Sequence, residues 1–125
     1  MDAPAPIRFQ FPRAARLRRS GEFAAVRRLG GRAVRGCLIL NWHDTPAGHR
    51  PRLGVVTSRK VGQAVVRSRV RRLLREVFRR HQHDLRGPMD VVLVARPSIA
   101  GKALADVERD FLAVLRGQAL LGVRT

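Results

Sequence analysis

Several common features are scarce or missing in this sequence of 125 residues. Cys37 is the single cysteine, so no disulfide can form within the chain, and a lone thiol suits a reducing compartment. No stretch approaches the roughly 20 apolar residues that a membrane-spanning helix needs. The first residues also lack the apolar segment of a secretory signal peptide. These absences predict a cytoplasmic protein.

Acidic residues are scarce as well. Nine aspartates and glutamates stand against 26 lysines and arginines, which gives a formal net charge of +17. A charge of this size on 14.0 kDa implies strong self-repulsion unless a polyanion neutralises it. Nucleic acid is the commonest such partner, and an anionic membrane surface is the main alternative. Charge therefore predicts a nucleic-acid-binding protein, but it does not distinguish RNA from DNA.

The chain does contain enough apolar material for one hydrophobic core. Hydrophobic residues make up 45% of the sequence and recur at regular spacings, which argues against wholesale disorder. The length fits a single domain. Residues 1–12 are rich in proline and are expected to form a mobile arm, residues 13–117 the folded domain, and residues 118–125 a C-terminal tail.

The predicted elements follow the order helix, strands, helix, strand, helix. A first helix is expected over residues 21–29 with Ser20 as its N-cap, and a last helix over residues 102–116. The strands "CLILNWH" and "RLGVVTS" are expected to pair as an antiparallel hairpin within residues 38–57, after a short strand around Val34. "MDVVLVARP" is expected to be a strand buried on both faces. This order predicts an α+β fold with a single small sheet and helices packed on it.

The stretch "VVRSRVRRLLREVFRR" carries seven arginines and one acidic residue. At about 100° per residue, it predicts an amphipathic helix over residues 64–81. One side gathers Val66, Val70, Leu73, Leu74 and Val77, with Phe78 at its edge. The opposite side gathers Arg71, Arg72, Arg75 and Arg79, with Ser68 among them. The apolar side is expected to pack on the sheet.

The arginine side does not mix charges of both signs, unlike most solvated helix faces. Arginines four residues apart, such as Arg71 and Arg75, destabilise an isolated helix by about 0.2–0.5 kcal/mol per pair. Phosphate groups would relieve that repulsion, because a planar guanidinium can hold a phosphate through two hydrogen bonds and can stack on an unpaired base. Phosphate binding is therefore the preferred interpretation, and a merely solvated face is the alternative.

This region resembles a known family signature. "SRKVGQAVVRSRVRRLLREVFRRH" is similar to the motif of the protein component of bacterial ribonuclease P. That motif typically reads Ser-Lys-Lys-(Val/Ile)-Gly-Asn-Ala-Val-x-Arg-Asn-Arg-(Ile/Val)-Lys-Arg-Leu-(Ile/Leu)-Arg-Glu. "RLRRSGEF", "RLGVVTSRK" and "MDVVLVARP" are similar to its surroundings, so the resemblance spans most of the chain.

The resemblance implies a division of labour between RNA and protein. In that family a large RNA subunit, using Mg²⁺ that it binds itself, hydrolyses precursor tRNA at the 5′ end of the mature tRNA. The protein binds this RNA and the 5′ leader, and lowers the demand for metal ions. This chain is accordingly expected to be a monomer within the ribonucleoprotein, to partner ribonuclease P RNA and precursor tRNA, and to bind no membrane. The family also has a left-handed crossover around its arginine helix, contrary to the common rule.

The resemblance extends to single residues. Those expected to contact RNA are Arg59, Lys60, Arg67, Ser68, Arg69, Arg71, Arg72 and Arg75. Arg79, on the arginine side of the same helix but beyond the quoted motif, is expected to bind RNA as well. Arg59 and Lys60 match paired basic positions before the helix, and Arg71 stands where lysine is common. Ser68 stands where asparagine is usual, which puts the contact of that amide in doubt.

The family's central cleft, which holds the single-stranded leader, has one match in Phe23. Core packing of the first helix is the alternative role for this ring. Base–aromatic stacking contributes about 1–3 kcal/mol per base. Arg27 and Asn41 occupy places where the family often has further aromatics, and alternation along the strand directs Trp42 to the opposite face from Asn41. Because the chain has no tyrosine, leader binding is expected to rest more on guanidinium stacking or to be weaker.

Other chemistries have weaker support in the sequence. Asp106 and Asp110 could share a helix face as a magnesium site, but solvated acids are the preferred interpretation. His81 and His83 have poor spacing for a helical metal pair, and with Cys37 they are too sparse for zinc. No catalytic residue and no metal ligand is therefore assigned to this chain. Two other functions stay open: a structural RNA-binding protein of ribosomal type without a role in cleavage, and a basic module on an anionic membrane.

Overall fold

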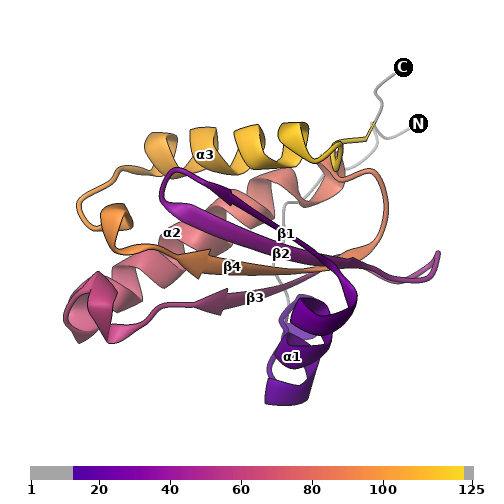
Figure 1. The fold of residues 1–125 in the computed structure, drawn as a ribbon, viewed down its shortest axis with the longest axis horizontal. Helices are drawn as coiled ribbons and strands as arrows, with labels where there is room; N and C mark the ends of the chain where they lie inside the picture. The colour runs from indigo at the N-terminus through magenta and orange to yellow at the C-terminus, as the bar shows by residue number, and fades with distance from the viewer. Residues whose placement is uncertain (1–12, 123–125) are drawn as a thin grey trace, which may run out of the picture.

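The computed structural model of the chain describes residues 13–122 (Figure 1). The helices are α1 (Ser20–Leu29), α2 (Ala64–His81) and α3 (Leu104–Gly117), and the strands are β1 (Gly31–Arg35), β2 (Leu38–Asp44), β3 (Arg52–Val56) and β4 (Met89–Ala95). This order confirms the predicted α+β fold class. The arm predicted at residues 1–12 lies outside the described residues.

The four strands form one mixed sheet in the order β1-β2-β4-β3. β2 is antiparallel to both β1 and β4, whereas β3 is parallel to β4. β4 therefore lies inside the sheet, with a neighbouring strand on each side, and all but one of its residues are buried. Its unbroken apolar run reflects this position, because both of its faces are covered.

The hairpin predicted within residues 38–57 is wrong. β2 and β3 run in opposite directions, but β4 lies between them and pairs with each. The turn residues between β2 and β3 indicate that the chain reverses, but they do not specify which strand becomes the neighbour. The most apolar strand takes the inner position because burial there removes both of its faces from water. The hairpin that does form joins β1 to β2 through Gly36, whose φ of 53° favours glycine.

The helices cover the two faces of the sheet unequally (Figure 1). α2 and α3 pack on one face and enclose the main core. The strands contribute to that core Leu38, Leu40, Leu53, Val91 and Leu93. α1 lies on the opposite face, where a second and smaller cluster is formed by Leu17, Val26 and Val92. The sheet therefore separates the helix rich in arginine from the helix that carries Phe23.

The segments β3, α2 and β4 form a parallel βαβ unit. In Figure 1 both strands point to the left, β4 lies above β3, and α2 passes behind the sheet. This path is a left-handed crossover, the hand that is rare among such units. The handedness implied by the family resemblance is present in the chain.

The bounds of α2 agree with the predicted helix. Val70, Leu74, Val77 and Phe78 are fully buried in the main core. The spacing placed Phe78 at the edge of the apolar side, whereas the structure buries it completely. Each such side chain contributes about 1.5–3 kcal/mol by leaving water, so this face determines which side of α2 is turned outward. Neither α2 nor any other helix within residues 13–122 has the length and apolar character to cross a bilayer.

The ends of the other two helices differ slightly from the prediction. α1 already includes Ser20, so Arg19 stands at the N-cap position. The Glu22 carboxylate accepts hydrogen bonds from the backbone N–H groups of Arg18 and Arg19 at 3.2 and 3.1 Å. The carboxylate at the third position of the helix thus reaches back to backbone donors at and before the N-cap. Beyond α3, Leu120 is fully buried, so the described part of the predicted tail packs on the core.

Candidate nucleic-acid interface

The outward side of α2 presents its arginines at different depths. Arg69 and Arg72 are exposed, and Arg67, Arg71 and Arg75 are half-buried. No carboxylate within residues 13–122 forms an ion pair with any of these five arginines, which we call the arginine face. The N-terminal part of α2 is therefore a cationic surface that the described chain does not neutralise.

Internal hydrogen bonds orient two guanidinium groups of the arginine face. Arg71 donates to Thr57 Oγ1 at 2.9 Å and to Ser68 Oγ at 3.1 Å. Arg69 donates to the backbone oxygen of Lys102 at 2.9 Å. A guanidinium has five N–H donors, so donors remain on both groups for an external acceptor. Ser68, at the position where the family usually has asparagine, braces a neighbouring arginine.

Arg79 lies farther along α2 and has an internal partner. Its Nε and Nη2 donate to the two oxygens of the Glu76 carboxylate at 2.9 and 2.7 Å, and Arg80 Nε donates to the same carboxylate at 3.0 Å. The hydrogen bond from Arg79, supported by that from Arg80, lowers the pKa of Glu76 to about 2. Glu76 therefore stays ionised and offsets charge at the C-terminal part of the helix. An RNA contact by Arg79 stays a prediction, and it would compete with this bidentate pair.

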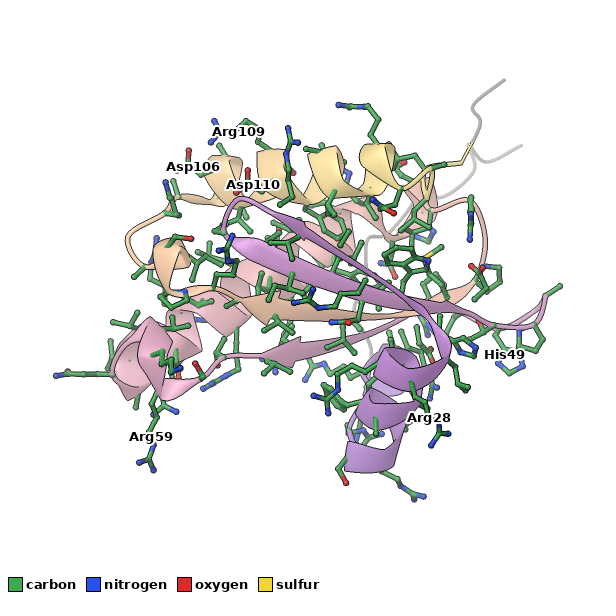
Figure 2. The ribbon with its side chains drawn as sticks, viewed as in Figure 1. Arg28, His49, Arg59, Asp106, Arg109 and Asp110 are labelled. Atoms are coloured by element: carbon green, nitrogen blue, oxygen red, sulfur yellow. The ribbon has the colours of Figure 1, made fainter. Side chains whose placement is uncertain are left out.

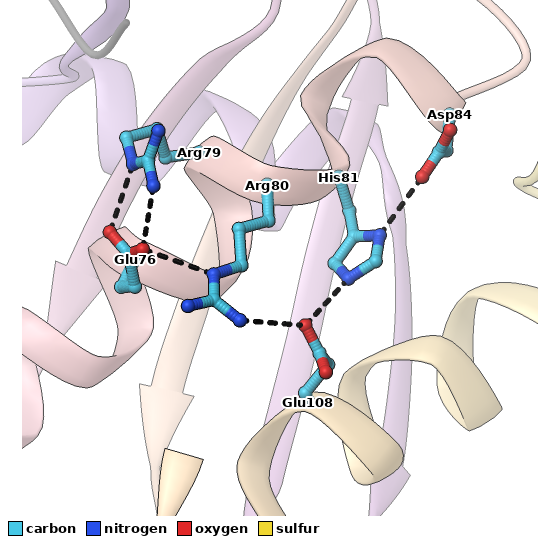
Figure 3. A network of polar contacts seen from close by, with 6 residues as sticks. All are labelled: Glu76, Arg79, Arg80, His81, Asp84 and Glu108. Carbon is cyan, nitrogen blue, oxygen red and sulfur yellow. Dashed lines mark hydrogen bonds and ion pairs between the residues drawn. The ribbon is translucent and has the colours of Figure 1, made fainter. Parts of the chain in front are cut away.

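A polar network continues from this pair to α3 (Figure 3). Arg80 lies 3.9 Å from the Glu108 carboxylate, and the two ring nitrogens of His81 lie 2.9 Å from carboxylate oxygens of Asp84 and Glu108. These contacts attach the C-terminal end of α2 to α3. Across residues 13–122, no group of three or more His, Cys, Asp or Glu side chains is arranged to hold a metal ion.

The remaining acids of α3 also make internal contacts. Asp106 accepts a hydrogen bond from the Ala103 N–H at the start of the helix, and Asp110 accepts one from the Cys37 N–H, both at 3.0 Å. Figure 2 shows Asp106, Arg109 and Asp110 along α3.

Burial, together with the adjacent Asp110, raises the pKa of the Cys37 thiol to about 12. That thiol therefore stays protonated and unreactive at neutral pH.

Arg59 and Lys60 extend the cationic surface beyond the helix. Both are exposed and belong to the short 3-10 turn η2 (Arg59–Val61) that leads into α2. Figure 2 shows Arg59 projecting away from the body of the molecule next to the start of α2. Gly62 follows with a φ of 151°, and a Cβ there would stand 3.0 Å from Val66. Glycine therefore permits the sharp entry that places the two basic residues beside the arginine face.

A hollow of about 620 Å³ lies over the arginine face. Arg69, Arg72 and Arg75 line it from α2, and Leu104 lines it from α3. Arg16, from the segment before α1, completes this side of the hollow. Arg16 is not among the RNA contacts predicted from the sequence, because an arginine in a basic N-terminal run has no periodic signal that separates it from its neighbours.

Phe23 lies on the other face of the sheet and is half-buried beside Val26 and Val92. Its ring lies over the backbone of Gly54 in β3, where an added Cβ would stand 2.5 Å from Phe23 Cε1. Gly54 is thus a structural support that the sequence analysis missed, since a single glycine in a strand only hints at a close approach. The Phe23 ring is therefore packed on the sheet on one side and partly exposed on the other. Its contact with a leader stays a prediction.

Arg27 shares a hollow with Phe23 on the same side of α1. This hollow of about 360 Å³, which we call the α1 cleft, has Val92 and Val94 of β4 among its lining residues. Val56, 38% exposed, adds an apolar surface from β3. A ring, a guanidinium and apolar side chains around one hollow are suited to stacking of an unpaired base.

Asn41 does not line the α1 cleft. It is 4% exposed and lies opposite Val92 in the pairing of β2 with β4. Trp42 packs against the main core on the opposite face, as strand alternation predicts. The role of Asn41 in leader binding stays a prediction, and its burial leaves little of the amide for an external partner.

Comparisons with known sequences match most of the length of this chain. A family model described as Ribonuclease P matches residues 11–118. A ribonuclease P protein component from Beutenbergia cavernae is 44% identical over 99 residues, which cover 79% of this chain and 83% of the relative. Another from Desulfovibrio desulfuricans is 41% identical over 116 residues, which cover 90% of this chain and 88% of the relative.

Solved structures show the same fold. The RNase P protein from Thermotoga maritima matches with a TM-score of 0.71 at 25% identity, covering 82% of this chain and 96% of that one. The RNase P protein from Staphylococcus aureus matches with a TM-score of 0.77 at 20% identity, covering 86% of this chain and 98% of that one. At these identities the arrangement of helices and strands is retained although most side chains differ.

Proposed function

Because this chain belongs to the ribonuclease P protein family, we propose that it is the protein subunit of ribonuclease P and acts in 5′ processing of tRNA. Its partner is ribonuclease P RNA, and its substrate is precursor tRNA. The protein binds both RNAs, and the holoenzyme removes the 5′ leader by endonucleolytic cleavage. On this proposal the chain acts in the cytoplasm, as one copy within a ribonucleoprotein.

The unneutralised arginine face carries this proposal. Its five guanidinium groups lie on one side of a helix whose other side is buried, so their positions are held by the core. Like charges this close repel each other unless an anion lies between them. RNA phosphates supply that charge, and the guanidinium fork matches their geometry. Arg59, Lys60 and Ser68 extend or brace this surface.

The α1 cleft supports the second part of the proposal, contact with the leader. Phe23 offers a ring face to an unpaired base, and Arg27 offers a guanidinium four residues further along α1. The two surfaces lie on opposite faces of the sheet. One protein can therefore touch the catalytic RNA with α2 and the substrate with α1.

We assign the chemistry of cleavage to the RNA subunit and its bound Mg²⁺. The acids of α3 that could serve a metal instead support the fold: Glu108 contacts His81, Asp106 caps α3, and Asp110 accepts a hydrogen bond from the Cys37 backbone. The protein residues bind and orient RNA, and they bring the leader and the catalytic RNA onto one scaffold. The protein thereby gives the holoenzyme tighter substrate binding and a lower requirement for Mg²⁺ than the RNA subunit has alone.

Single-turnover cleavage of a precursor tRNA at low Mg²⁺ tests this function. The reaction combines a bacterial ribonuclease P RNA with or without this protein. We expect cleavage at the mature 5′ end only when both components are present. Tight RNA binding without stimulation would indicate a structural RNA-binding protein instead. Cleavage by the protein alone would refute the assignment of chemistry to the RNA.

A further inference from the structure

The segment before α1 runs along the outer edge of the sheet. Arg16 forms a parallel bridge with Leu53 of β3, and the Leu17 N–H donates to the Leu53 oxygen at 2.8 Å. β3 is an edge strand, so this segment covers part of its free side. The backbone of Arg16 is therefore held at the border between the two faces of the sheet.

At this border one hollow is lined from both faces. It measures about 250 Å³, and its walls include Phe23 from α1, Arg75 from α2 and Arg16 from the edge segment. Gly54 lies under the Phe23 ring, and its lack of a side chain keeps the ring close to the strand. The α1 cleft and the arginine face are thus connected around β3, although their helices pack on opposite faces.

Arg16 also lines two neighbouring hollows. One is the 620 Å³ hollow over the arginine face, and the other is a hollow of about 360 Å³ whose walls include Arg18, Arg19 and Arg52. A polyanion that follows the positive surface from α1 to α2 around this edge would pass Arg16.

The environment of Arg75 favours an anion at this point. Burial lowers the pKa of the Arg75 guanidinium, and the nearby charges of Arg16 and Arg71 lower it further. No carboxylate of the described chain pairs with Arg75. Two guanidinium groups brought together at a partly desolvated site can both donate to one phosphate, which removes the repulsion between them.

We propose that Arg16 and Arg75 hold one backbone phosphate of an RNA strand that crosses the edge of the sheet at β3. The inference rests on the proposed function, because it makes this edge the passage between the leader surface and the surface for the catalytic RNA. The phosphodiester can belong to the leader or to the catalytic RNA, since the recognising chemistry is the same.

A double-mutant cycle on the protein alone tests the shared phosphate. The variants R16A, R75A and R16A/R75A are titrated with a fluorescent single-stranded oligoribonucleotide across a range of salt. We expect the double variant to lose clearly less affinity than the product of the two single losses, because both side chains serve one contact. Its salt slope should fall by about 0.7, the value of one single-strand phosphate. R109A, on the acidic helix α3, removes the same charge elsewhere and should leave affinity and slope near wild type.

A second probe identifies the phosphate directly. Neutral methylphosphonate linkages are placed one at a time along a short oligoribonucleotide with a single defined binding register. One position should weaken binding to the wild-type protein and have no further effect on R16A/R75A. The proposal would be overturned if the affinity losses of R16A and R75A multiplied in the double variant. It would also be overturned if R16A bound RNA as tightly as R109A. Thermal unfolding of each variant checks that the fold is retained.

Assays in the holoenzyme distinguish the two sources of the phosphate. If it belongs to the leader, R16A should weaken binding of precursor tRNA in proportion to the leader present and leave mature tRNA binding unchanged. If it belongs to the catalytic RNA, R16A should weaken assembly of the holoenzyme whatever the leader length. No effect in either assay would contradict the proposed crossing. Because the oligoribonucleotide cycle does not depend on cleavage, a wild-type protein that shows the cycle but fails to stimulate cleavage would count against the proposed function alone.

Discussion

At the scale of single residues, arginines of one helix differ in what surrounds each guanidinium. Arg72 is exposed and Arg69 keeps free donors beside its bond to Lys102, whereas Arg79 is held bidentately by Glu76. The number of arginines in the helix does not distinguish an exposed guanidinium group from one that is paired with a carboxylate. We therefore expect RNA binding to concentrate on the N-terminal part of α2.

Reversal of Arg69 and Arg72 to glutamate tests that conclusion. We expect R69E/R72E to keep the fold, because both side chains lie outside the core. RNA affinity should fall by about 100-fold or more, because each lost charge-assisted hydrogen bond is worth about 1.5–3 kcal/mol. Filter binding to ribonuclease P RNA measures this loss. R109E/R116E makes the same change of charge on α3 and should have a much smaller effect. Unchanged binding by a folded R69E/R72E protein would refute the assignment of this surface.

Gly54 provides a second test at a single position. In G54A the new Cβ would stand 2.5 Å from Phe23 Cε1, so the ring must shift away from the strand. We expect weaker binding of precursor tRNA with a leader and unchanged binding of the catalytic RNA, because α2 lies on the other face. F23A serves as the comparison, since it removes the ring outright. Equal loss of both RNA affinities in G54A would indicate a general structural defect.

At the scale of elements, α2 is a core helix on one side and a charged surface on the other. Its buried side holds the sheet, and its outward side divides into a cationic N-terminal part and a C-terminal part balanced by Glu76 and Glu108. The network with His81 attaches that second part to α3. Acids from two helices therefore limit how far the positive surface extends.

Replacement of Glu76 by glutamine should change stability in a way that depends on pH. Its pKa is lowered from 4.5 to about 2 in the folded chain, so its stabilising contribution is present above pH 4.5 and is lost as pH falls toward 2. We expect E76Q to unfold at a lower urea concentration than wild type at pH 7, and the difference to be lost as pH falls through about 2. Urea titrations at several pH values measure this.

The same substitution should also affect RNA binding. E76Q removes the negative charge beside Arg79 and Arg80, so the salt slope for RNA binding should become steeper. D44N also removes one negative charge, but from the exposed pair of Asp44 with Arg86, away from α2. A salt slope for E76Q no steeper than that for D44N would show that Arg79 and Arg80 stay away from RNA.

At the scale of the whole molecule, a small sheet separates two surfaces that both carry positive charge. We expect the net charge of +17 to attract RNA from every side, whereas the arginine face and the α1 cleft lie on opposite faces of the sheet. On the proposed function, long-range attraction comes from the total charge, and the two surfaces place the RNA.

RNA affinity should consequently depend strongly on salt. We expect log Kd for ribonuclease P RNA to rise linearly with log salt concentration, with a slope of about 0.7–0.9 per phosphate contacted. Titrations between low and physiological ionic strength measure the slope and count the contacts. A flat response would contradict an interface built on phosphates.

The amino-acid pattern by itself determined the local features of this protein. The bounds of α2, the burial of β4 and the opposition of valines to arginines follow from spacings within one segment, which a linear reading captures. The long motif from Ser58 to His81 also indicated the family, because its residues are contiguous. Within this motif, the complete burial of Phe78 still depended on the sheet on which α2 packs.

Only the tertiary structure decided the features that join distant segments. The insertion of β4 between β2 and β3, the Gly54 backbone under Phe23, and the meeting of Arg16 with Arg75 each combine residues far apart in the chain. Strand neighbours depend on which faces the whole fold can bury, and the environment of a charge depends on every element packed around it. Periodicity within a segment contains neither kind of information.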